Sequence, residues 1–206
     1  MNPLSESRQA RQSLVLIGGG GHCKACIDVI EATGEWDILG ILDLPERAGD
    51  QVLGYPVVGT DEEVGHYVIE GARFLVCLGQ IRTASPRRHA YERVKAAGGK
   101  LATIVSPLAY VSPSAVFGEG TIVMHRAVVN ASASIGDNVI INTMALVEHD
   151  ATVGSHCHVS TAAVLNGGAR IGVGSFVGSN AVIVQGATVP EDSFVPAGAV
   201  YRQREE

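Results

Sequence analysis

The sequence has little of what membrane, disulfide-rich or nucleic-acid-binding proteins need. No apolar run approaches the roughly 18 residues of a membrane-spanning helix. Residues 1–13 lack the apolar core of a signal peptide. The four cysteines form no spaced framework, which favours free thiols in a reducing cytoplasm. The net charge of −6 argues against a nucleic-acid surface.

Aromatic residues are also scarce, at 5% of the chain, whereas glycine is abundant, with 25 residues. The 206 residues are 46% hydrophobic and 17% charged, which is typical of a globular chain with room for one or two domains. A chain so rich in glycine and so poor in aromatic side chains is expected to contain many corners.

A strict repeat fills the second half of the chain. From Val105 to Tyr201 every sixth residue is apolar, and the residue two places earlier is nearly always small, with Val139 the one bulky exception. Neither a helical nor a strand period explains this spacing. A second period of eighteen places glycine directly after the apolar residue at Gly118, Gly136, Gly154 and Gly172.

Six residues with one large and one small apolar side chain suit a short strand and a corner, so three such units would make a triangular coil. The glycines would then stack at one corner, where we expect a demanding backbone conformation. Each coil would bury its apolar residues only against the coils above and below it. A β-sandwich is the alternative, but its strands would not keep one register for sixteen steps. The repeat resembles the hexapeptide-repeat acyltransferases, which implies a left-handed parallel β-helix of about five coils.

The first 100 residues or so have an α/β pattern. An apolar strand over residues 13–17 is followed by four glycines and then by a helical pattern that ends at Gly34. This arrangement would direct backbone N–H groups at an anion. Because Cys23 occupies the third glycine position of a G-x-G-x-x-G motif, a tight structural turn is an alternative to a ligand loop.

Further strands are predicted over residues 37–42, 73–78 and 101–105, with a short extended segment over residues 55–61. The second strand ends on Asp43, about where doubly wound nucleotide domains place a ribose-binding carboxylate, although an ordinary loop carboxylate is an alternative. The third strand ends at Gly79 and Gln80. A basic helix over residues 86–97 is predicted to present a solvated face, with a phosphate contact as the alternative; its cations are Arg87, Arg88, Arg93 and Lys95.

These patterns predict three parts. A flexible tail is expected over residues 1–13 and a Rossmann-like domain over residues 14–105, and the resemblance implies a left-handed β-helix acyltransferase domain over residues 106–206.

The segment GGGGHCKACID, at residues 18–28, sharpens the resemblance. It is similar to the G-x-G-G-H-x-K-x-x-x-D opening of one branch of these acyltransferases, which contains nucleotide-amino-sugar N-acetyltransferases of bacterial glycan biosynthesis and sialic acid O-acetyltransferases. The resemblance implies that residues 14–105 form a nucleotide-sugar-binding domain. In that domain the following residues are expected to contact the nucleotide-linked sugar: Gly20, Gly21, His22, Asp43, Leu44 and Gly79.

A histidine with acidic neighbours on both sides, Glu148-His149-Asp150, breaks the repeat. Acyl transfer to an amine or hydroxyl needs a base, and a neutral imidazole whose other nitrogen faces a carboxylate suits that role. A surface histidine in a charged corner is the alternative. The segment N-T-x-x-x-x-E-H-D at residues 142–150 resembles the active site of the family, which implies that His149 and Asp150 are catalytic.

The resemblance also implies contacts with acetyl-CoA. His158 matches a histidine near the thioester, and the N–H of Gly167 is a candidate oxyanion donor. Ser179 and Ala197 match positions along the CoA arm. The G-x-P-A-K tail that many relatives place beside the nucleotide end of CoA is missing, which puts contacts near the C-terminus in doubt.

Other candidate residues are given structural roles. We expect His125 and His156 to be structural or to support the site. Cys23 and Cys26 have the spacing of a redox pair but no surrounding thioredoxin pattern, so we expect two packed thiols.

The resemblance therefore implies an enzyme that transfers an acetyl group from acetyl-CoA to the 4-amino group of a nucleotide-linked amino-dideoxy sugar, with His149 as base, and no metal is expected. The cysteines favour a cytoplasmic location, and the resemblance implies a homotrimer with sites between subunits. O-acetylation of a sialic acid is the nearest alternative. A zinc enzyme of the γ-carbonic anhydrase kind lacks its histidine spacing here, and a non-catalytic sugar-nucleotide-binding module would leave His149 and His158 without a purpose.

Overall fold

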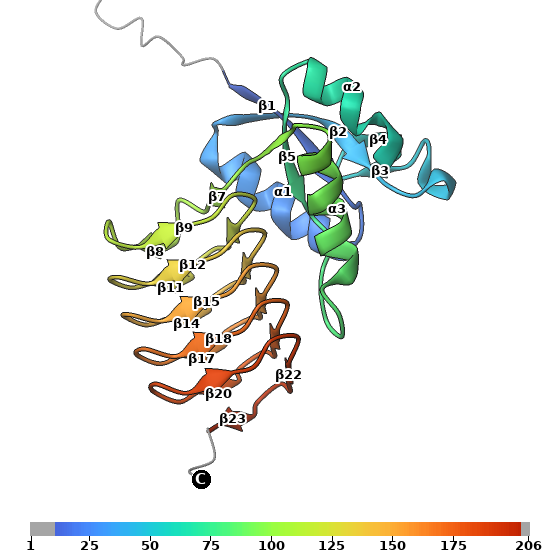
Figure 1. The fold of residues 1–206 in the computed structure, drawn as a ribbon. Coiled ribbons are helices and arrows are strands. Elements are labelled where there is room, and N and C mark those ends of the chain that lie inside the picture. Colours follow the sequence, from blue (N-terminus) through green and yellow to red (C-terminus); the bar gives the residue numbers. More distant parts are fainter. Residues whose placement is uncertain (1–10, 203–206) are drawn as a thin grey trace, which may run out of the picture.

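A computed structural model describes residues 11–202, and it divides them between an α/β domain and a prism of stacked coils (Figure 1). The first strand, β1 (Gln12–Ile17), begins inside the segment that was predicted to be a tail. That prediction is wrong for Gln12 and Ser13, because both pair with β2. For residues 1–10 it lies outside the described residues.

The α/β domain is built on a six-stranded sheet in the order β3-β4-β2-β1-β5-β6, parallel except for the β3–β4 pair. Its other strands are β2 (Trp36–Leu42), β3 (Gln51–Val52), β4 (Tyr55–Gly59), β5 (Arg73–Val76) and β6 (Lys100–Leu101). Its helices are α1 (Gly21–Thr33), α2 (Val64–Ile69) and α3 (Ser85–Ala96), with short 3-10 turns at Pro45–Arg47 and Asp61–Glu63. Helix α1 ends as predicted at Gly34, whose φ of 68° is the left-handed conformation that stops a helix.

The sheet is covered on both faces. Helix α1 packs between the sheet and the coils, because its buried residues Cys26 and Ile27 share a core with Ile122 and Ile140 of the prism. Helices α2 and α3 cover the opposite face, where Val64 and Val94 pack against the sheet. One face of the prism, which carries Ile122 and Ile140, therefore takes part in the core of the N-terminal domain.

Three parallel sheets form the prism, and each strand pairs with the strand eighteen residues away in sequence. The first sheet contains β7 (Ile104–Val105), β10 (Ile122–Val123), β13 (Ile140–Ile141), β16 (His158–Val159), β19 (Phe176–Val177) and β22 (Phe194–Val195). The second contains β8 (Tyr110–Val111), β11 (Val128–Val129), β14 (Leu146–Val147), β17 (Val164–Leu165), β20 (Val182–Ile183) and β23 (Val200–Tyr201). The third contains β9 (Val116–Phe117), β12 (Ser134–Ile135), β15 (Thr152–Val153), β18 (Arg170–Ile171) and β21 (Thr188–Val189).

The core of the prism consists of the two columns that the repeat predicts. Large apolar side chains such as Val147 and Leu165 and small ones such as Ala145 and Ala163 are fully buried in one cluster. Val139, the bulky exception, is buried there too. The predicted β-helix fold is therefore confirmed.

The stacked glycines lie at one edge as predicted, but the reason differs from the expected one. Gly118, Gly136, Gly154 and Gly172 do not have a positive φ. A Cβ at Gly154 would instead stand 2.7 Å from the backbone nitrogen of Val173 in the next coil. Close approach of the coils excludes a side chain at these positions.

The demanding backbone conformation, a positive φ, is found two residues after each stacked glycine and recurs at every sixth position. From Gly120 to Gly198 this residue always has a positive φ. Non-glycine residues occupy it at Arg126, Ser132, Asn138, Met144, Asp150, His156, Ala162, Asn180 and Asp192. The left-handed conformation turns the chain at all three edges, and asparagine and aspartate tolerate it better than most residues.

The prism has three edges, each of which joins two neighbouring sheets. The first edge joins the first sheet to the second, the second edge joins the second to the third, and the third edge joins the third to the first. The coils begin with β7, because Ile104 and Val105 already pair with β10. We therefore propose a domain boundary just before Ile104 instead of after Val105.

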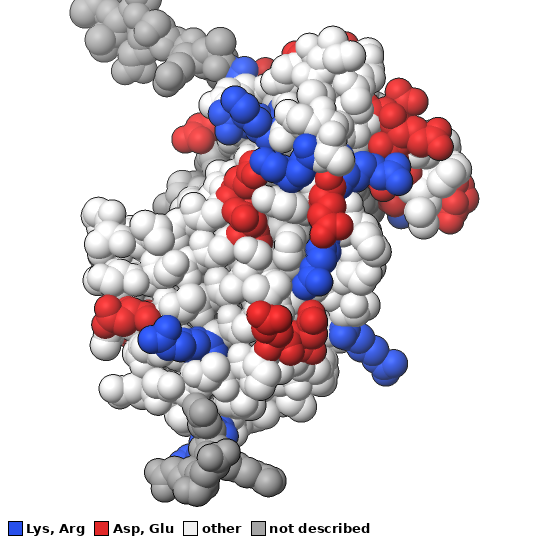
Figure 2. Space-filling model, in the orientation of Figure 1, with Lys and Arg blue, Asp and Glu red and all other residues white. Residues whose placement is uncertain are grey.

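Helix α3 runs along the third edge and fastens the domains together. Lys95 pairs with Glu119, and Arg88 lies 3.5 Å from Asp192 four coils further down. On the face seen in Figure 2, charged side chains gather over the N-terminal domain and along this junction, whereas much of the coil surface is uncharged. Within residues 11–202, no helix has the length and apolarity that crossing a membrane would require.

Candidate active site

His149 and Asp150 lie side by side on the second edge. His149 Nδ1 is 2.8 Å from Asp150 Oδ2, and both side chains are well exposed. The hydrogen bond to Asp150 raises the pKa of His149 above its ordinary value. Because a carboxylate only accepts, Nδ1 carries the proton and Nε2 keeps its lone pair. Glu148 contributes differently, since its Oε2 accepts from the His149 backbone N–H at 3.2 Å.

Gly167 lies one coil beyond His149 on the same edge. A Cβ built on Gly167 would stand 2.8 Å from Nε2 and Cε1 of His149, so the imidazole lies directly over the glycine. Within residues 11–202 the Gly167 N–H has no hydrogen-bond partner, whereas its carbonyl accepts from Gly186. A free lone pair and a free N–H are thus neighbours on the second edge.

His158 occupies a different part of the prism. It belongs to β16 on the first sheet and is 7% exposed, beneath the loop that follows β5. Its Nδ1 is 2.9 Å from the Gln80 carbonyl and its Nε2 is 3.0 Å from Asn142 Nδ2. The Asn142 Oδ1 accepts from Thr143 N–H, which fixes the amide orientation. His158 therefore has its proton on Nδ1.

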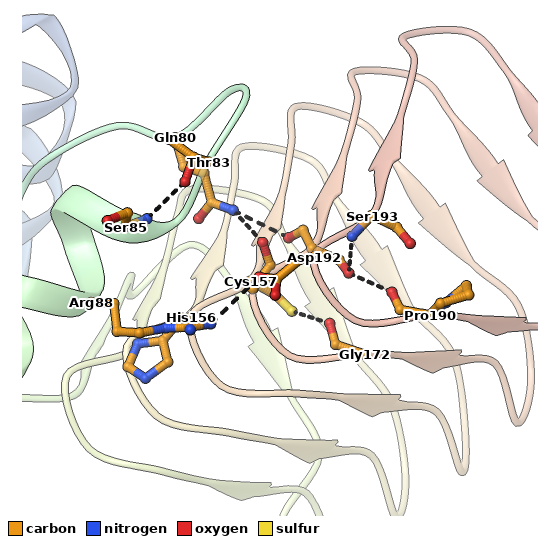
Figure 3. A network of polar contacts seen from close by, with 12 residues as sticks. Gln80, Thr83, Ser85, Arg88, His156, Cys157, Gly172, Pro190, Asp192 and Ser193 are labelled. Carbon is orange, nitrogen blue, oxygen red and sulfur yellow. Dashed lines mark hydrogen bonds and ion pairs between the residues drawn. The ribbon is translucent and has the colours of Figure 1, made fainter.

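Burial keeps His158 neutral. It lowers the pKa of His158 to about 4, although the hydrogen bond to Gln80 acts in the opposite direction. Figure 3 shows Gln80 reaching from the loop to the carbonyls of the coils, where its Nε2 is 2.9 Å from the Gly174 oxygen. The N-terminal domain thereby covers and orients the histidine.

Ser179 and Ala197 lie on the first edge, in the two coils below His158. Ser179 Oγ is 3.0 Å from Ser160 Oγ. Gly178 approaches Ala197 so closely that a Cβ there would stand 2.4 Å from the Ala197 nitrogen. These two candidates therefore share a side of the prism with His158, and Gly167 does not.

The glycine loop separates two hollows at the carboxyl end of the N-terminal sheet. One, of about 380 Å³, is lined by Gly20, Gly21, His22, Gly79, Gln80 and His158, among others. The other, of about 530 Å³, is lined by Gly18, Asp43, Leu44, Thr60, His89 and Arg93, among others. Leu78 borders both. All six predicted sugar-nucleotide residues thus line one hollow or the other.

Asp43 uses its carboxylate within the chain. Oδ2 accepts from Gly19 N–H at 2.8 Å, and Oδ1 accepts from Leu44 N–H at 2.9 Å. Arg47 lies 3.6 Å from the same carboxylate. Asp43 therefore fixes the glycine loop, and a ligand in the larger hollow would meet a carboxylate that already has partners.

The predicted residues form two groups on different sides of one chain. His149, Asp150 and Gly167 lie on the second edge, opposite the first sheet, which carries His158 and the N-terminal domain. Sequence reasoning assigned no role to Gln80 beyond the end of a strand or to Asn142 beyond a motif letter. The one signal for Gln80 was its place directly after Gly79.

The prediction for Arg87 was wrong. Instead of facing solvent it is 0% exposed, and its guanidinium bonds to four acceptor atoms of the protein. A basic helix gives no indication of which of its cations faces inward, because the acceptors that bind Arg87 are mainly backbone carbonyls from distant segments.

His125 and His156 both contact the N-terminal domain from the prism. His125 Nε2 is 2.9 Å from Asp28 on α1, and its Nδ1 is 2.6 Å from Ser106 Oγ. His156 Nδ1 is 3.0 Å from Asn138 Nδ2, and its ring packs edge-on against Tyr91. All four cysteines are free and buried. Among residues 11–202, no three His, Cys, Asp or Glu side chains are grouped as a metal site would need.

Known proteins share both halves of this architecture. Residues 13–94 match the PglD N-terminal domain family. The acetyltransferase domain of PglB from Neisseria gonorrhoeae FA1090, solved with acetyl coenzyme A, is 36% identical, with a TM-score of 0.86 over 94% of this chain and 92% of that one. PerB from Caulobacter crescentus, solved with CoA and GDP-perosamine, is 38% identical, with a TM-score of 0.85 over 94% of this chain and 90% of that one.

A more distant structure shares the fold alone. WeeI from Acinetobacter baumannii AYE is 16% identical, with a TM-score of 0.55 over 91% of this chain and 94% of that one. No curated protein gives a significant match. Since the PglB and PerB matches exceed a third identity over nearly the whole chain, the protein belongs to the hexapeptide-repeat acyltransferases with a left-handed β-helix, in their sugar N-acetyltransferase branch.

Proposed function

We propose that this enzyme transfers the acetyl group of acetyl-CoA to the 4-amino group of a nucleotide-linked amino-dideoxy sugar, with His149 as general base. One observation carries the proposal: the 2.8 Å contact between His149 Nδ1 and Asp150, which leaves the Nε2 lone pair free above Gly167. The relatives support the substrates, since PglB was solved with acetyl coenzyme A and PerB with CoA and GDP-perosamine.

The chemistry follows from this pair. The neutral sugar amine attacks the thioester carbonyl carbon while its proton passes to His149 Nε2. Asp150 accepts from Nδ1–H throughout and stabilises the imidazolium that forms. When the tetrahedral intermediate collapses, the C–S bond breaks, and His149 returns the proton to the departing CoA sulfur. The products are an acetamido sugar and free CoA.

The free N–H of Gly167 supports a second role in the same step. A donor at this place can stabilise the negative oxygen of the tetrahedral intermediate, which is worth about 3 kcal/mol in comparable sites. Because the donor is a backbone group, no side-chain substitution removes it. A substitution at Gly167 would act by moving His149.

We assign both substrates, the nucleotide-linked sugar and the CoA arm, to the side of the prism that carries the first sheet and the first edge. We propose that the nucleotide-linked sugar spans the two hollows beside Gly20, Gly21 and His22. In this proposal the CoA arm follows the first edge from His158 past Ser179 to Ala197. The start of α1, which no side chain caps within residues 11–202, directs backbone N–H groups that favour a diphosphate there.

This division supports a homotrimer with shared sites. In one chain His149 lies on the second edge, whereas His22 of α1 and His158 of the first sheet line one hollow on the other side of the prism. A second copy would bring its second edge to the first edge of its neighbour and complete the site. A cyclic arrangement of three copies satisfies every edge in the same way. We place the reaction in the cytoplasm, where the four free thiols stay reduced.

A thiol-release assay tests the proposal. Wild type and His149→Ala are compared with acetyl-CoA and a panel of nucleotide 4-amino sugars, 4-hydroxy counterparts and free sialic acids. We expect rapid CoA release with one amino sugar and a loss of about 10²- to 10⁴-fold in the variant. Release with a sialic acid alone would overturn the acceptor, and equal rates for His149→Ala would overturn the base.

A further inference from the structure

Arg87 differs from the other cations of α3. It is 0% exposed and is among the largest fully buried side chains, whereas the side chains of Arg88 and Arg93 are partly exposed. Burial lowers its pKa to about 10, so the guanidinium stays charged at neutral pH. Burying a charge is costly unless the protein compensates it.

No carboxylate within residues 11–202 pairs with Arg87, so its charge is stabilised mainly by the dipoles of carbonyl groups. Nη1 donates to the carbonyls of Val76 at 3.2 Å and Leu78 at 2.6 Å. Nη2 donates to the Asn138 carbonyl at 2.9 Å and to its Oδ1 at 2.7 Å. The Nε atom is buried and has no hydrogen-bond partner in the part of the chain that the structure describes. Electrostatic interactions with the thiols of Cys26 and Cys77 oppose the effect of burial on the pKa of Arg87.

The two halves of the guanidinium bind different domains. Val76 is the last residue of β5, and Leu78 lies in the loop that follows. Asn138 lies on the third edge of the prism. Asn138 Nδ2 also returns a bond to the Arg87 carbonyl at 3.2 Å. Arg87 therefore sets the position of the end of β5 relative to the coils.

The segment that follows connects both parts of the site on this side. Gly79 and Gln80 line the 380 Å³ hollow together with His22. The Gln80 carbonyl accepts from His158 Nδ1–H, and its Nε2 donates to the Gly174 carbonyl. A shift of Leu78 would move the wall of the hollow and the acceptor of His158 together.

We propose that Arg87 is the positioning residue of this side of the site: its buried guanidinium fixes the Leu78–Gln80 segment between the sugar-nucleotide hollow and His158. The assignment of the hollow to a sugar nucleotide rests on the proposed function. The positioning itself does not, because it follows from contacts within the chain. Because carbonyl groups and not a carboxylate bind Arg87, the guanidinium keeps its charge and orients those carbonyls toward itself.

Native-state amide exchange tests the positioning without any substrate. Arg87→Met keeps the length and removes the charge and donors. Arg88→Met is the matched control, since Arg88 also joins α3 to the coils and has no hydrogen bond or ion pair with β5 within residues 11–202. In Arg87→Met we expect exchange in a peptide spanning residues 77–81 to rise at least tenfold. Peptides of β1 and of the lower coils should change less than twofold, and Arg88→Met should leave residues 77–81 unchanged.

Kinetics supply the second readout. In Arg87→Met the KM for the sugar nucleotide should rise at least tenfold and the KM for acetyl-CoA should rise with it, because the wall of the hollow and the acceptor of His158 move together, while Arg88→Met should leave both KM values unchanged. Arg87→Lys keeps the charge but not the forked donors, so its KM for the sugar nucleotide should lie between those of wild type and Arg87→Met. If Arg87→Met does not fold, Arg87→Lys and Asn138→Ala undergo the same exchange measurement, with faster exchange confined to residues 77–81 expected in both.

Two results would overturn the inference. Exchange that rises evenly along the chain would show that Arg87 contributes only general stability. Unchanged exchange at residues 77–81 in every variant would show that other contacts position the segment. If wild type acetylates no sugar nucleotide, the proposed function fails, but the exchange experiment still decides the role of Arg87.

Discussion

The imidazole of His149 lies directly over Gly167, so that a methyl group on the glycine would stand 2.8 Å from Nε2 and Cε1. Gly167 has no positive φ, and its backbone can accept alanine. The restriction at this position therefore comes from the histidine and not from the fold. This separates a catalytic requirement from a structural one.

Gly167→Ala should accordingly reduce activity without unfolding the protein. Because His149 is exposed, it can rotate away from the new methyl group, and Nε2 then leaves its place beside the Gly167 N–H. A displacement of about 1 Å can cost roughly hundredfold in rate. We expect kcat to fall between about tenfold and hundredfold, measured by thiol release, with little change in Tm.

Gly65→Ala is the matched control for that change. Gly65 lies in α2 with open space around its Cα and an ordinary φ. It should leave kcat unchanged and stabilise the helix by up to about 1 kcal/mol. Equal kcat values for Gly167→Ala and wild type would contradict the proposed position of His149 in the reaction.

The pH dependence of the reaction should report the contact between His149 and Asp150. His149 acts as a base only when neutral, so kcat/KM should rise with pH through its pKa. The hydrogen bond that His149 donates to Asp150 raises the pKa of His149. In Asp150→Asn the acid limb should therefore move to lower pH, while the plateau falls by about tenfold or more.

Asparagine is the right replacement because residue 150 has a φ of 61°, which asparagine tolerates and alanine resists. Profiles of kcat/KM from pH 5 to 9 for both proteins make the comparison. An acid limb that stays in place would mean that a group other than His149 controls it.

Much of the prism could be predicted from the sequence because its interactions are periodic. Each buried residue, such as Val147, meets the residues eighteen positions away, so the period itself encodes the contacts. The reason for the stacked glycines was misjudged, since a sequence does not tell a positive φ from a close approach. At Gly154 the approaching atom belongs to Val173 of the next coil.

The site could be predicted only where a local motif carries it. His149 and Asp150 are adjacent in sequence, whereas the partners of His158 and Arg87 come from segments 78 and 51 residues away. Such contacts depend on how α3 lies against the third edge. No repeat or motif records that packing, so Arg87 was taken for a surface cation.

His158 should make the stability of the protein depend on pH in the acid range. Its pKa falls from an ordinary 6.5 to about 4 on burial, so the folded form stays neutral while the unfolded chain takes up a proton. The stabilising contribution is complete above pH 6.5 and is lost as the pH falls toward 4. The free energy of unfolding should decrease by about 3 kcal/mol at most over this range.

Denaturant unfolding of wild type and His158→Gln at several pH values isolates this contribution. The difference between the two proteins should shrink as the pH falls from 6.5 to 4, because only wild type loses the contribution of His158. A difference that stays constant with pH would mean that His158 titrates near its ordinary value in the folded protein.

Mixed trimers should recover activity that neither parent has. His149→Ala removes the base on the second edge, and His22→Ala alters the hollow at the N-terminal domain, so each protein alone should be at least hundredfold slower than wild type. If every site joins the second edge of one chain to the hollow of its neighbour, random mixing leaves about one quarter of the sites with both residues intact. Co-expressed and co-purified chains, assayed by thiol release, should then show roughly a quarter of wild-type activity. The same two proteins purified separately and mixed without subunit exchange serve as the control and should stay inactive. Co-expressed trimers that remain as slow as their parents would mean that each chain supplies both residues to one site, and the shared-site arrangement would have to be abandoned.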